Sequence, residues 1–215
     1  MFIEELTKDQ RFFFAVCITV IVSICLHELA HGVVAILFGD RTPIESGHMT
    51  LNPAAHVSPV SIVCLLLAGI AWGMMPVDPR RMRGRYAESF VALAGPAMNV
   101  LLAVLALASL GVWQRLDDRP TAELSTTLQN LTYFLWVFGF VNFHLAVFNL
   151  IPVPPLDGSR ILGNISGSYA RLMQTLSMTG GLIVIFIILF SFAGRVTAPL
   201  ASKAAIAVLR AVRGS

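Results

Sequence analysis

Charged side chains are scarce in this sequence of 215 residues. They make up 13% of the chain, whereas about 25% is usual for a soluble globular domain. So little charge cannot cover the surface of a water-soluble globule. Intrinsic disorder is excluded as well, because disordered chains combine low hydropathy with high net charge, and this chain has a mean hydropathy of +0.78 and a formal net charge of +3. An integral membrane protein remains, and the length suits one small polytopic bundle.

Cysteine is also rare, and a long basic tract is missing. The three cysteines (Cys17, Cys25 and Cys64) lie inside apolar stretches, which favours buried free thiols over a disulfide framework. The 15 basic residues are scattered or flank apolar runs, a distribution typical of anchoring at a membrane edge rather than of nucleic-acid binding. Acidic residues near the start, and the lack of a small-residue cleavage site after the first apolar run, lead us to expect no cleavable signal peptide.

Long apolar runs divide the chain into membrane segments. A helix needs about 20 apolar residues to cross a bilayer, and four runs meet this length: 12–38, 87–113, 131–151 and 172–193. A fifth run, 57–75, is a further candidate. The tail at 197–213 mixes apolar with basic residues, which predicts an amphipathic helix on the bilayer surface. The sequence therefore predicts an all-α polytopic membrane protein in which residues 1–215 form a single domain.

The first apolar run carries the motif His27-Glu28-Leu29-Ala30-His31. Ionisable residues are costly inside a membrane and indicate a functional site there. Residues four apart share one face of a helix, so both imidazoles can reach the same ion. Zinc accepts imidazole nitrogens, and a neighbouring carboxylate such as Glu28 can take a proton from a zinc-bound water. The motif therefore predicts one zinc ion per chain, with His27 and His31 as two of its ligands.

A catalytic zinc ion usually has three protein ligands, so a third must come from elsewhere in the chain. Asp157 is the best candidate, because three prolines precede it and a glycine follows it. Such a segment is rigid and non-helical, and at membrane depth this backbone is tolerated only where protein buries it or where it lines a watery cavity. The later glutamates lie at or beyond predicted membrane edges; they are Glu45, Glu88 and Glu123. Three other histidines are expected to make structural hydrogen bonds; they are His48, His56 and His144.

Three blocks, in this order, resemble the site-2 proteases, a family of intramembrane zinc metalloproteases. The first block is His27 to Gly32, the second is Ala94-Gly95-Pro96-Ala97-Met98-Asn99, and the third runs from Asn149 to Gly158. The resemblance covers the chain from about 12 to 165. A further block, Leu51 to Pro59, resembles a segment of the compact bacterial members, which lack extra peptide-binding or nucleotide-sensing domains. The usual Asp of that segment is replaced here by Ser58.

The resemblance implies a three-helix catalytic core with additional membrane helices around it. His27, His31 and Asp157 would be the zinc ligands, and Glu28 would be the general base. Asn149 would help to hold the substrate or the developing oxyanion; for Asn99 this role and a structural hydrogen bond between helices both remain open. The implied activity is hydrolysis of peptide bonds within or next to transmembrane segments of membrane proteins, in regulated intramembrane proteolysis.

Depth in the membrane restricts the path of the 57–75 segment. His31 lies late in the first span and Asp157 follows the end of the span 131–151, so both can meet one ion only if those two ends face the same side. A full crossing at 57–75 would separate them. We therefore expect this segment to re-enter and return, or to form a hairpin, which gives four crossings with both chain ends on one side.

Basic residues in the short loops favour a cytoplasmic location for the metal side. Without the tail, seven would lie on the metal side and four on the other: Arg41, Arg80, Arg81, Arg83, Arg85, Arg160 and Arg171, against Lys8, Arg11, Arg115 and Arg119. We accordingly expect a multi-pass protein of the bacterial cytoplasmic membrane. Its expected partners are the lipid bilayer, transmembrane protein substrates and a separate regulatory membrane protein, with no nucleic acid.

Two other functions remain open. One is a membrane zinc protease of another type, whose third ligand is a glutamate such as Glu88. The other is a non-catalytic scaffold that binds metal. Zinc binding alone does not need the carboxylate of Glu28, which makes the scaffold the weaker hypothesis.

Overall fold

The computed structural model describes residues 2–117, 119–178 and 181–213, and in these residues it contains helices and no β-strand. The all-α prediction is therefore confirmed. In chain order the elements are η1 (Phe2–Glu4), α1 (Glu5–Lys8), α2 (Gln10–Leu37), α3 (Thr42–Glu45), α4 (Pro53–His56), α5 (Pro59–Ala68), η2 (Pro79–Arg81), α6 (Ala87–Leu116), η3 (Thr121–Glu123), α7 (Thr126–Asn149), α8 (Asp157–Ile165), α9 (Gly167–Met178) and α10 (Gly181–Arg213).

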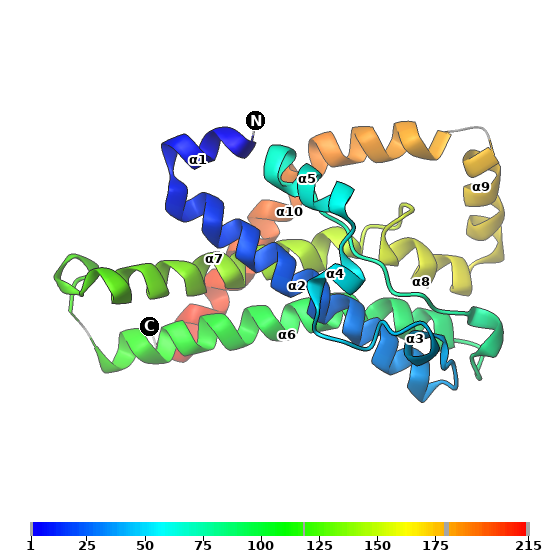
Figure 1. The fold of residues 1–215 in the computed structure, drawn as a ribbon, viewed down its shortest axis with the longest axis horizontal. Helices are drawn as coiled ribbons and strands as arrows, with labels where there is room; N and C mark the ends of the chain where they lie inside the picture. Colours follow the sequence, from blue (N-terminus) through cyan, green and yellow to red (C-terminus); the bar gives the residue numbers. More distant parts are fainter. Residues whose placement is uncertain (1, 118, 179–180, 214–215) are drawn as a thin grey trace.

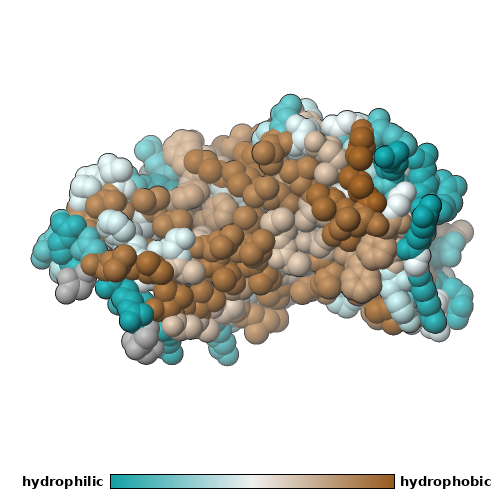
Figure 2. All heavy atoms as spheres, turned by 90° about the horizontal axis from the view of Figure 1, so that it is seen from below, coloured by the Kyte–Doolittle hydropathy of each residue, from teal (hydrophilic) through white to brown (hydrophobic). Residues whose placement is uncertain are grey.

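Four helical stretches in the described part of the chain are long and apolar enough to cross a membrane: α2, α6, α7 and the Phe192–Arg213 part of α10. α6 and α7 lie side by side along the long axis of the molecule, and α2 and α10 pack against both (Figure 1). Hydrophobic surface forms a broad central region, while hydrophilic residues gather at the two ends (Figure 2). This distribution is that of a helix bundle whose middle faces lipid.

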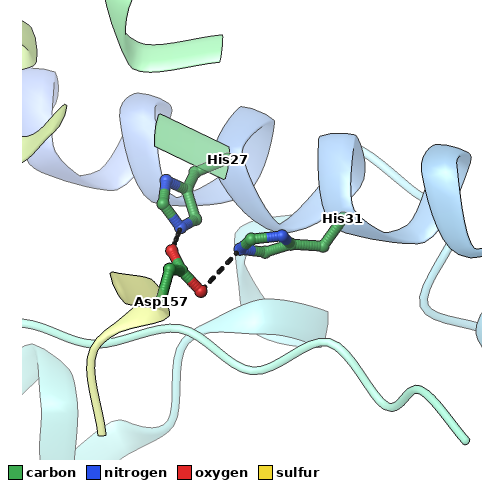
Figure 3. A group of neighbouring side chains, drawn as sticks. All are labelled: His27, His31 and Asp157. Atoms are coloured by element: carbon green, nitrogen blue, oxygen red, sulfur yellow. Dashed lines mark ion pairs between the residues drawn. The ribbon is translucent and has the colours of Figure 1, made fainter. Parts of the chain in front are cut away.

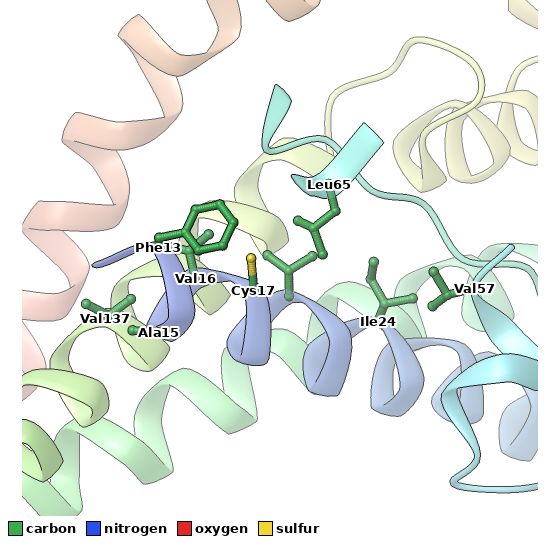
Figure 4. Close-up of a cluster of buried hydrophobic side chains, with 9 residues drawn as sticks. Phe13, Ala15, Val16, Cys17, Ile24, Val57, Leu65 and Val137 are labelled. Carbon is green, nitrogen blue, oxygen red and sulfur yellow. The ribbon is translucent and has the colours of Figure 1, made fainter. Parts of the chain in front are cut away.

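Buried apolar side chains hold α2 against its neighbours (Figure 4). Phe13 and Ile24 on α2 belong to one cluster with Leu65 from α5 and Val137 from α7. Lipid is as apolar as these side chains, so close packing between the helices, rather than exclusion of water, stabilises such a contact. The cluster places α2, and with it the His-Glu motif, between α7 and the segment that contains α5.

The last helix differs from the prediction. The expected span 172–193 is divided between α9 and α10, with residues 179–180 outside the described residues. α10 continues through 197–213 instead of lying separately on the bilayer surface, because Ala201 and Ala205 are completely buried against α6 and α7. Small side chains allow helices to approach closely in a membrane. Residues 197–213 therefore pack against α6 and α7, although their amphipathic pattern led us to expect a helix on the bilayer surface.

The segment between α2 and α6 forms a hairpin rather than a fifth crossing. α5 has 10 residues, about 15 Å of helix, which is half the thickness of a bilayer core. After α5, residues 70–78 return as extended chain without regular secondary structure. The backbone N–H of Arg83 then donates to the carbonyl of Phe38 at 2.8 Å. The chain thus comes back to the end of α2 that it left, and the predicted hairpin is confirmed.

Asp40 fastens the two ends of this hairpin together. Its carboxylate is completely buried; Oδ1 accepts the backbone N–H of Thr42 at 2.9 Å, and Oδ2 accepts the backbone N–H of Asp78 at 2.7 Å. Burial by itself raises the pKa of Asp40, but the hydrogen bonds from Thr42 and Asp78 and the charge of Arg81 outweigh it and hold the pKa below its ordinary value. Asp40 is therefore an ionised anchor for the returning segment.

We expect Asp40→Asn to lower the free energy of unfolding by about 1–3 kcal/mol, because the new amide places a donor opposite the Asp78 N–H. Since the folded pKa of Asp40 is depressed, its contribution is present above the ordinary carboxyl pKa of about 3.9 and is lost as the pH falls below that value. Thermal unfolding in detergent at pH 7, followed by circular dichroism, measures the change. Asp117→Asn, which removes the exposed ion pair with Arg119, is the matched control and should leave the midpoint unchanged. Equal midpoints for both variants would contradict the anchor.

Candidate metal centre

Three side chains from distant parts of the sequence converge at one point (Figure 3). His27 and His31 extend from α2, and Asp157 extends from the start of α8. Nε2 of His27 lies 3.1 Å from Oδ2 of Asp157, and Nε2 of His31 lies 3.4 Å from Oδ1. All three side chains are buried, and one ligand atom from each lies within 4.8 Å of the others. The structure thus brings together the three ligands that we predicted from the sequence.

The proline-rich turn before α8 determines the position of the Asp157 carboxylate. α7 ends at Asn149 and α8 begins at Asp157, because Pro152, Pro154 and Pro155 between them cannot continue a helix. Residues 150–156 join the two helices without helical structure of their own. Asp157 therefore occupies the first turn of α8, close in sequence to the end of α7 and facing the two histidines in the second half of α2.

Hydrogen bonds on the far side of each imidazole decide which nitrogen faces the carboxylate. Nδ1 of His31 lies 2.6 Å from the backbone carbonyl of Val91, which can only accept, so Nδ1 carries the proton. Nδ1 of His27 lies 2.6 Å from Oδ1 of Asn99. In the neutral imidazoles Nε2 is then the unprotonated atom, and it presents a lone pair at the point of convergence. This is the form in which histidine binds a metal ion.

A chain of amides assigns the orientation of Asn99. Its Nδ2 donates to Oδ1 of Asn142 at 3.0 Å, and Nδ2 of Asn142 donates to the carbonyl of Phe138 at 2.9 Å. Oδ1 of Asn99 is therefore the acceptor that faces His27. This arrangement favours an orienting role for Asn99 over the oxyanion contact. Sequence reasoning missed Asn142; the available signal was a polar amide inside the apolar run 131–151.

Gly95 allows α6 to approach the two imidazoles. A Cβ atom at this position would overlap Nε2 of His27 and Nε2 of His31. α6 supplies both Nδ1 partners, Val91 and Asn99, from either side of this glycine. The Ala94–Asn99 block thus has a local reason for its composition: a residue without a side chain lies beside the ligands, and an amide follows one turn later.

The three side chains fit a divalent metal ion. Ligand atoms that share a zinc ion at about 2.0–2.1 Å lie about 3.3 Å apart; here each Nε2 lies 3.1 or 3.4 Å from one of the two oxygens of Asp157, and one ligand atom from each residue lies within 4.8 Å of the others. Oδ2 of Asp157 is buried and accepts no hydrogen bond within the described residues. A buried carboxylate oxygen without such a partner is costly, and a cation between the three groups compensates it.

The metal group lies on the wall of a cavity of about 640 Å³. α2, the extended segment 69–75, α7 and the turn before α8 line this cavity. Glu28 also lines it and is buried, and its carboxylate rests on Gly73, where a Cβ atom would overlap Oε1. The predicted ligands and the predicted base therefore share one cavity.

The remaining candidate residues lie apart from the metal group. Glu88 pairs loosely with Arg160 at 3.9 Å, and it belongs to no ligand cluster in the described residues. Asn149 lines the cavity, and its amide donates to the carbonyl of Leu145 at 3.0 Å. Two further histidines make local hydrogen bonds, as expected: Nδ1 of His48 with Ser46, and Nε2 of His56 with the carbonyl of Thr50.

Comparison with known proteins supports the same chemistry. The pattern of Peptidase family M50 matches residues 13–192. YwhC of Bacillus subtilis, a proposed zinc metalloprotease, is 38% identical over 175 residues, which cover 80% of this chain and 78% of YwhC. Rip2 of Mycolicibacterium smegmatis, also a proposed zinc metalloprotease, is 31% identical over 177 residues, 79% of this chain and 64% of Rip2. The zinc metalloprotease MJ0392 of Methanocaldococcus jannaschii is 28% identical over 80% of this chain and 40% of its own length. No solved structure matches this chain.

The family match spans most of the chain and includes the segments that carry His27, Glu28 and Asp157. Its relatives carry the names of zinc metalloproteases, and the three converging side chains suit that metal. The resemblance seen in the sequence is thereby confirmed. The chain belongs to Peptidase family M50, the site-2 protease family of membrane-embedded zinc metalloproteases.

Proposed function

We propose that this protein is an intramembrane endopeptidase that cleaves membrane proteins within or next to their transmembrane segments, in regulated intramembrane proteolysis. One observation carries the proposal: a metal-ligand triad and a carboxylate share a cavity in a bundle of apolar helices. Such groups are too costly to place among apolar helices without a function. A scaffold that only binds metal needs neither the cavity nor Glu28.

The roles follow from the position of each side chain. His27, His31 and Asp157 would hold a zinc ion, which when bound supplies the Lewis acid that polarises the scissile carbonyl and lowers the pKa of water towards about 7. Glu28 takes a proton from the water as the water oxygen attacks the carbonyl carbon. It then passes that proton to the departing amine nitrogen as the carbon–nitrogen bond breaks.

The extended segment beside Glu28 supports binding of an unwound substrate. Ser61 binds the backbone of Trp72 on both its N–H and its carbonyl, and Met74 donates its N–H to the carbonyl of His56. The alternate N–H groups, those of Ala71, Gly73 and Met75, have no hydrogen-bond partner among the described residues. One edge of the segment is thus attached to the hairpin and the other is open. An extended peptide can pair with such an open edge.

We further propose that the metal centre lies nearer the cytoplasmic face of a bacterial cytoplasmic membrane. The basic residues of the short loops support this orientation. The hairpin strengthens it, because Arg41 and the cluster Arg80–Arg85 flank its two ends, which lie together. A separate membrane protein would then provide regulation.

Zinc analysis of two variants distinguishes the proposed ligand set from one completed by a glutamate. Asp157→Ala should lose most of its zinc, because it removes one of three ligands. Glu88→Ala should retain one zinc ion per chain. Inductively coupled plasma mass spectrometry of both proteins, purified side by side, gives the metal content. Retained zinc in Asp157→Ala, or lost zinc in Glu88→Ala, would exclude the proposed ligand set.

Asn99→Ala should weaken zinc binding by about tenfold to a hundredfold, because His27 loses the hydrogen bond that holds its ring and tautomer. Competition with a chelator of known affinity measures this change. Asn164→Ala, which removes a part-buried hydrogen bond between α6 and α8, is the control and should retain the parent affinity. If zinc affinity is the same in both variants, Asn99 does not orient His27.

The proposed base is tested by Glu28→Gln. The amide keeps the shape of the side chain and cannot accept the proton, so zinc should be retained while cleavage of a transmembrane substrate in detergent falls by at least about a hundredfold. Cleavage by the parent protein should also disappear on addition of a chelator and return with zinc. A Glu28→Gln protein that still cleaves would exclude Glu28 as the base, and a parent protein that binds zinc without ever cleaving would favour the scaffold.

A further inference from the structure

His144 lines the cavity and has no part in the roles described above. It lies on α7, with its ring stacked between Phe140 and Phe148 at centroid distances of 6.3 and 6.5 Å. An imidazole within a membrane helix is costly unless its nitrogens find partners. The partners of its two nitrogens therefore indicate what it does.

Thr197 on α10 determines which nitrogen of His144 carries the proton. The Thr197 hydroxyl is buried, lies 2.9 Å from the carbonyl of Ala193 and lies 3.2 Å from Nδ1 of His144. The carbonyl can only accept, so the single hydroxyl proton of Thr197 is donated to Ala193. The hydroxyl oxygen must then accept a proton from Nδ1. Burial among apolar helices disfavours the charged imidazolium, so His144 is a neutral Nδ1–H imidazole whose Nε2 carries a lone pair.

Nε2 of His144 makes no hydrogen bond with any part of the chain that the structure describes. His144 is among the residues that line the cavity, and an Nε2 lone pair without a partner in the described chain can accept a hydrogen bond from a molecule bound there. A hydrogen-bond acceptor is what an unwound helix requires there. Its freed N–H groups cost several kcal/mol each in an apolar medium if they stay unpaired, and the open edge of the 70–75 segment can satisfy one side of an extended peptide only.

We propose that His144 is a substrate-positioning residue, which accepts at Nε2 a hydrogen bond from an N–H or O–H group of the bound substrate segment. The inference rests on the proposed function, because it concerns the same cavity. The donor is either a backbone N–H released by unwinding or a side-chain hydroxyl of the substrate. Thr197 orients His144 from outside the cavity, so α10 contributes to the site through one hydrogen bond.

Two substitutions separate hydrogen bonding from packing. His144→Phe keeps an aromatic ring between Phe140 and Phe148 and removes the acceptor, whereas His144→Gln provides an amide oxygen in its place. His48→Phe is the matched control, since His48 is a half-buried histidine that hydrogen-bonds to Ser46 outside the cavity. All variants are made in the zinc-loaded Glu28→Gln protein, so that binding is measured without cleavage.

The probe is a fluorescent transmembrane peptide of about 20 apolar residues with a central Gly-Ser pair, and fluorescence anisotropy in detergent gives its Kd. His144→Phe should bind the peptide about threefold to tenfold more weakly, the change that corresponds to one neutral hydrogen bond. His144→Gln should recover most of the affinity, and His48→Phe should match the parent. Equal affinity in His144→Phe, or no recovery with His144→Gln, would overturn the inference.

A purely structural role of His144 would change the zinc content or the unfolding midpoint. We expect both quantities to be the same in all variants. If His144→Phe unfolds at a lower temperature than the parent, Thr197→Val decides the matter instead. It releases the ring of His144 without touching the cavity, and it should also weaken binding; an unchanged Kd in Thr197→Val would then reject the proposal.

Two modified peptides identify the donor. Replacing the peptide serine by alanine removes the hydroxyl, and N-methylation at single central positions removes one backbone N–H at a time. The peptide that lacks the true donor should bind the parent more weakly and bind His144→Phe with the same affinity as the unmodified peptide, because the hydrogen bond is already absent. If every modification weakens binding equally in both proteins, His144 receives no hydrogen bond from the substrate.

Cleavage is assayed separately with Glu28 intact. His144→Phe should raise KM with little change in kcat, as expected for loss of ground-state binding. A protein that binds the peptide through His144 and never cleaves it refutes the protease proposal alone. If the parent and His144→Phe cleave with the same KM, the role of His144 alone is refuted. A parent protein with no affinity for any peptide refutes both the protease proposal and the role of His144.

Discussion

The structure depends on one constraint: two imidazoles and a carboxylate are buried together in a bundle of apolar helices. Each imidazole is satisfied on both sides. Its Nε2 faces the point where the three groups converge, and its Nδ1 donates to α6 through Val91 or Asn99. α6 is therefore central to the site although it carries no ligand. The same helix has to pass close to the ligands, which explains why a glycine lies between the two hydrogen-bonding positions.

The hairpin between α2 and α6 gives the metal centre its surroundings. Because α5 is too short to cross a bilayer, the chain turns back, and its extended return places Gly73 on Glu28. Asp40 attaches the end of that return to the end of α2. One edge of the returning segment is bonded to the hairpin, the other has N–H groups without partners among the described residues, and the segment lines the cavity. The returning segment of the hairpin thus also forms one wall of the proposed substrate site.

Two pairs of polar side chains inside this bundle link helices. Asn99 and Asn142 join α6 to α7, and His144 and Thr197 join α7 to α10. Each link orients a histidine: the first orients the ligand His27, and the second orients a histidine on the cavity wall. In a medium without water such bonds are worth making, because the alternative is an unpaired polar atom among apolar side chains. The outer helices therefore influence the site through side chains that do not reach the metal.

The sequence by itself determined the local part of this protein. Apolar run lengths predicted α2, α6 and α7, the four-residue spacing of His27 and His31 placed both rings on one helix face, and the prolines ended α7 before Asp157. The spans, the histidine spacing and the proline segment all depend on periodicity and backbone sterics, which act over a few residues. The amide chain behind His27, the burial of α10 against α6 and α7, and the proton position on His144 were decided only by the tertiary structure. The hydrogen bonds involved join residues 43 to 72 positions apart. A local sequence pattern does not show which of several buried polar groups will meet.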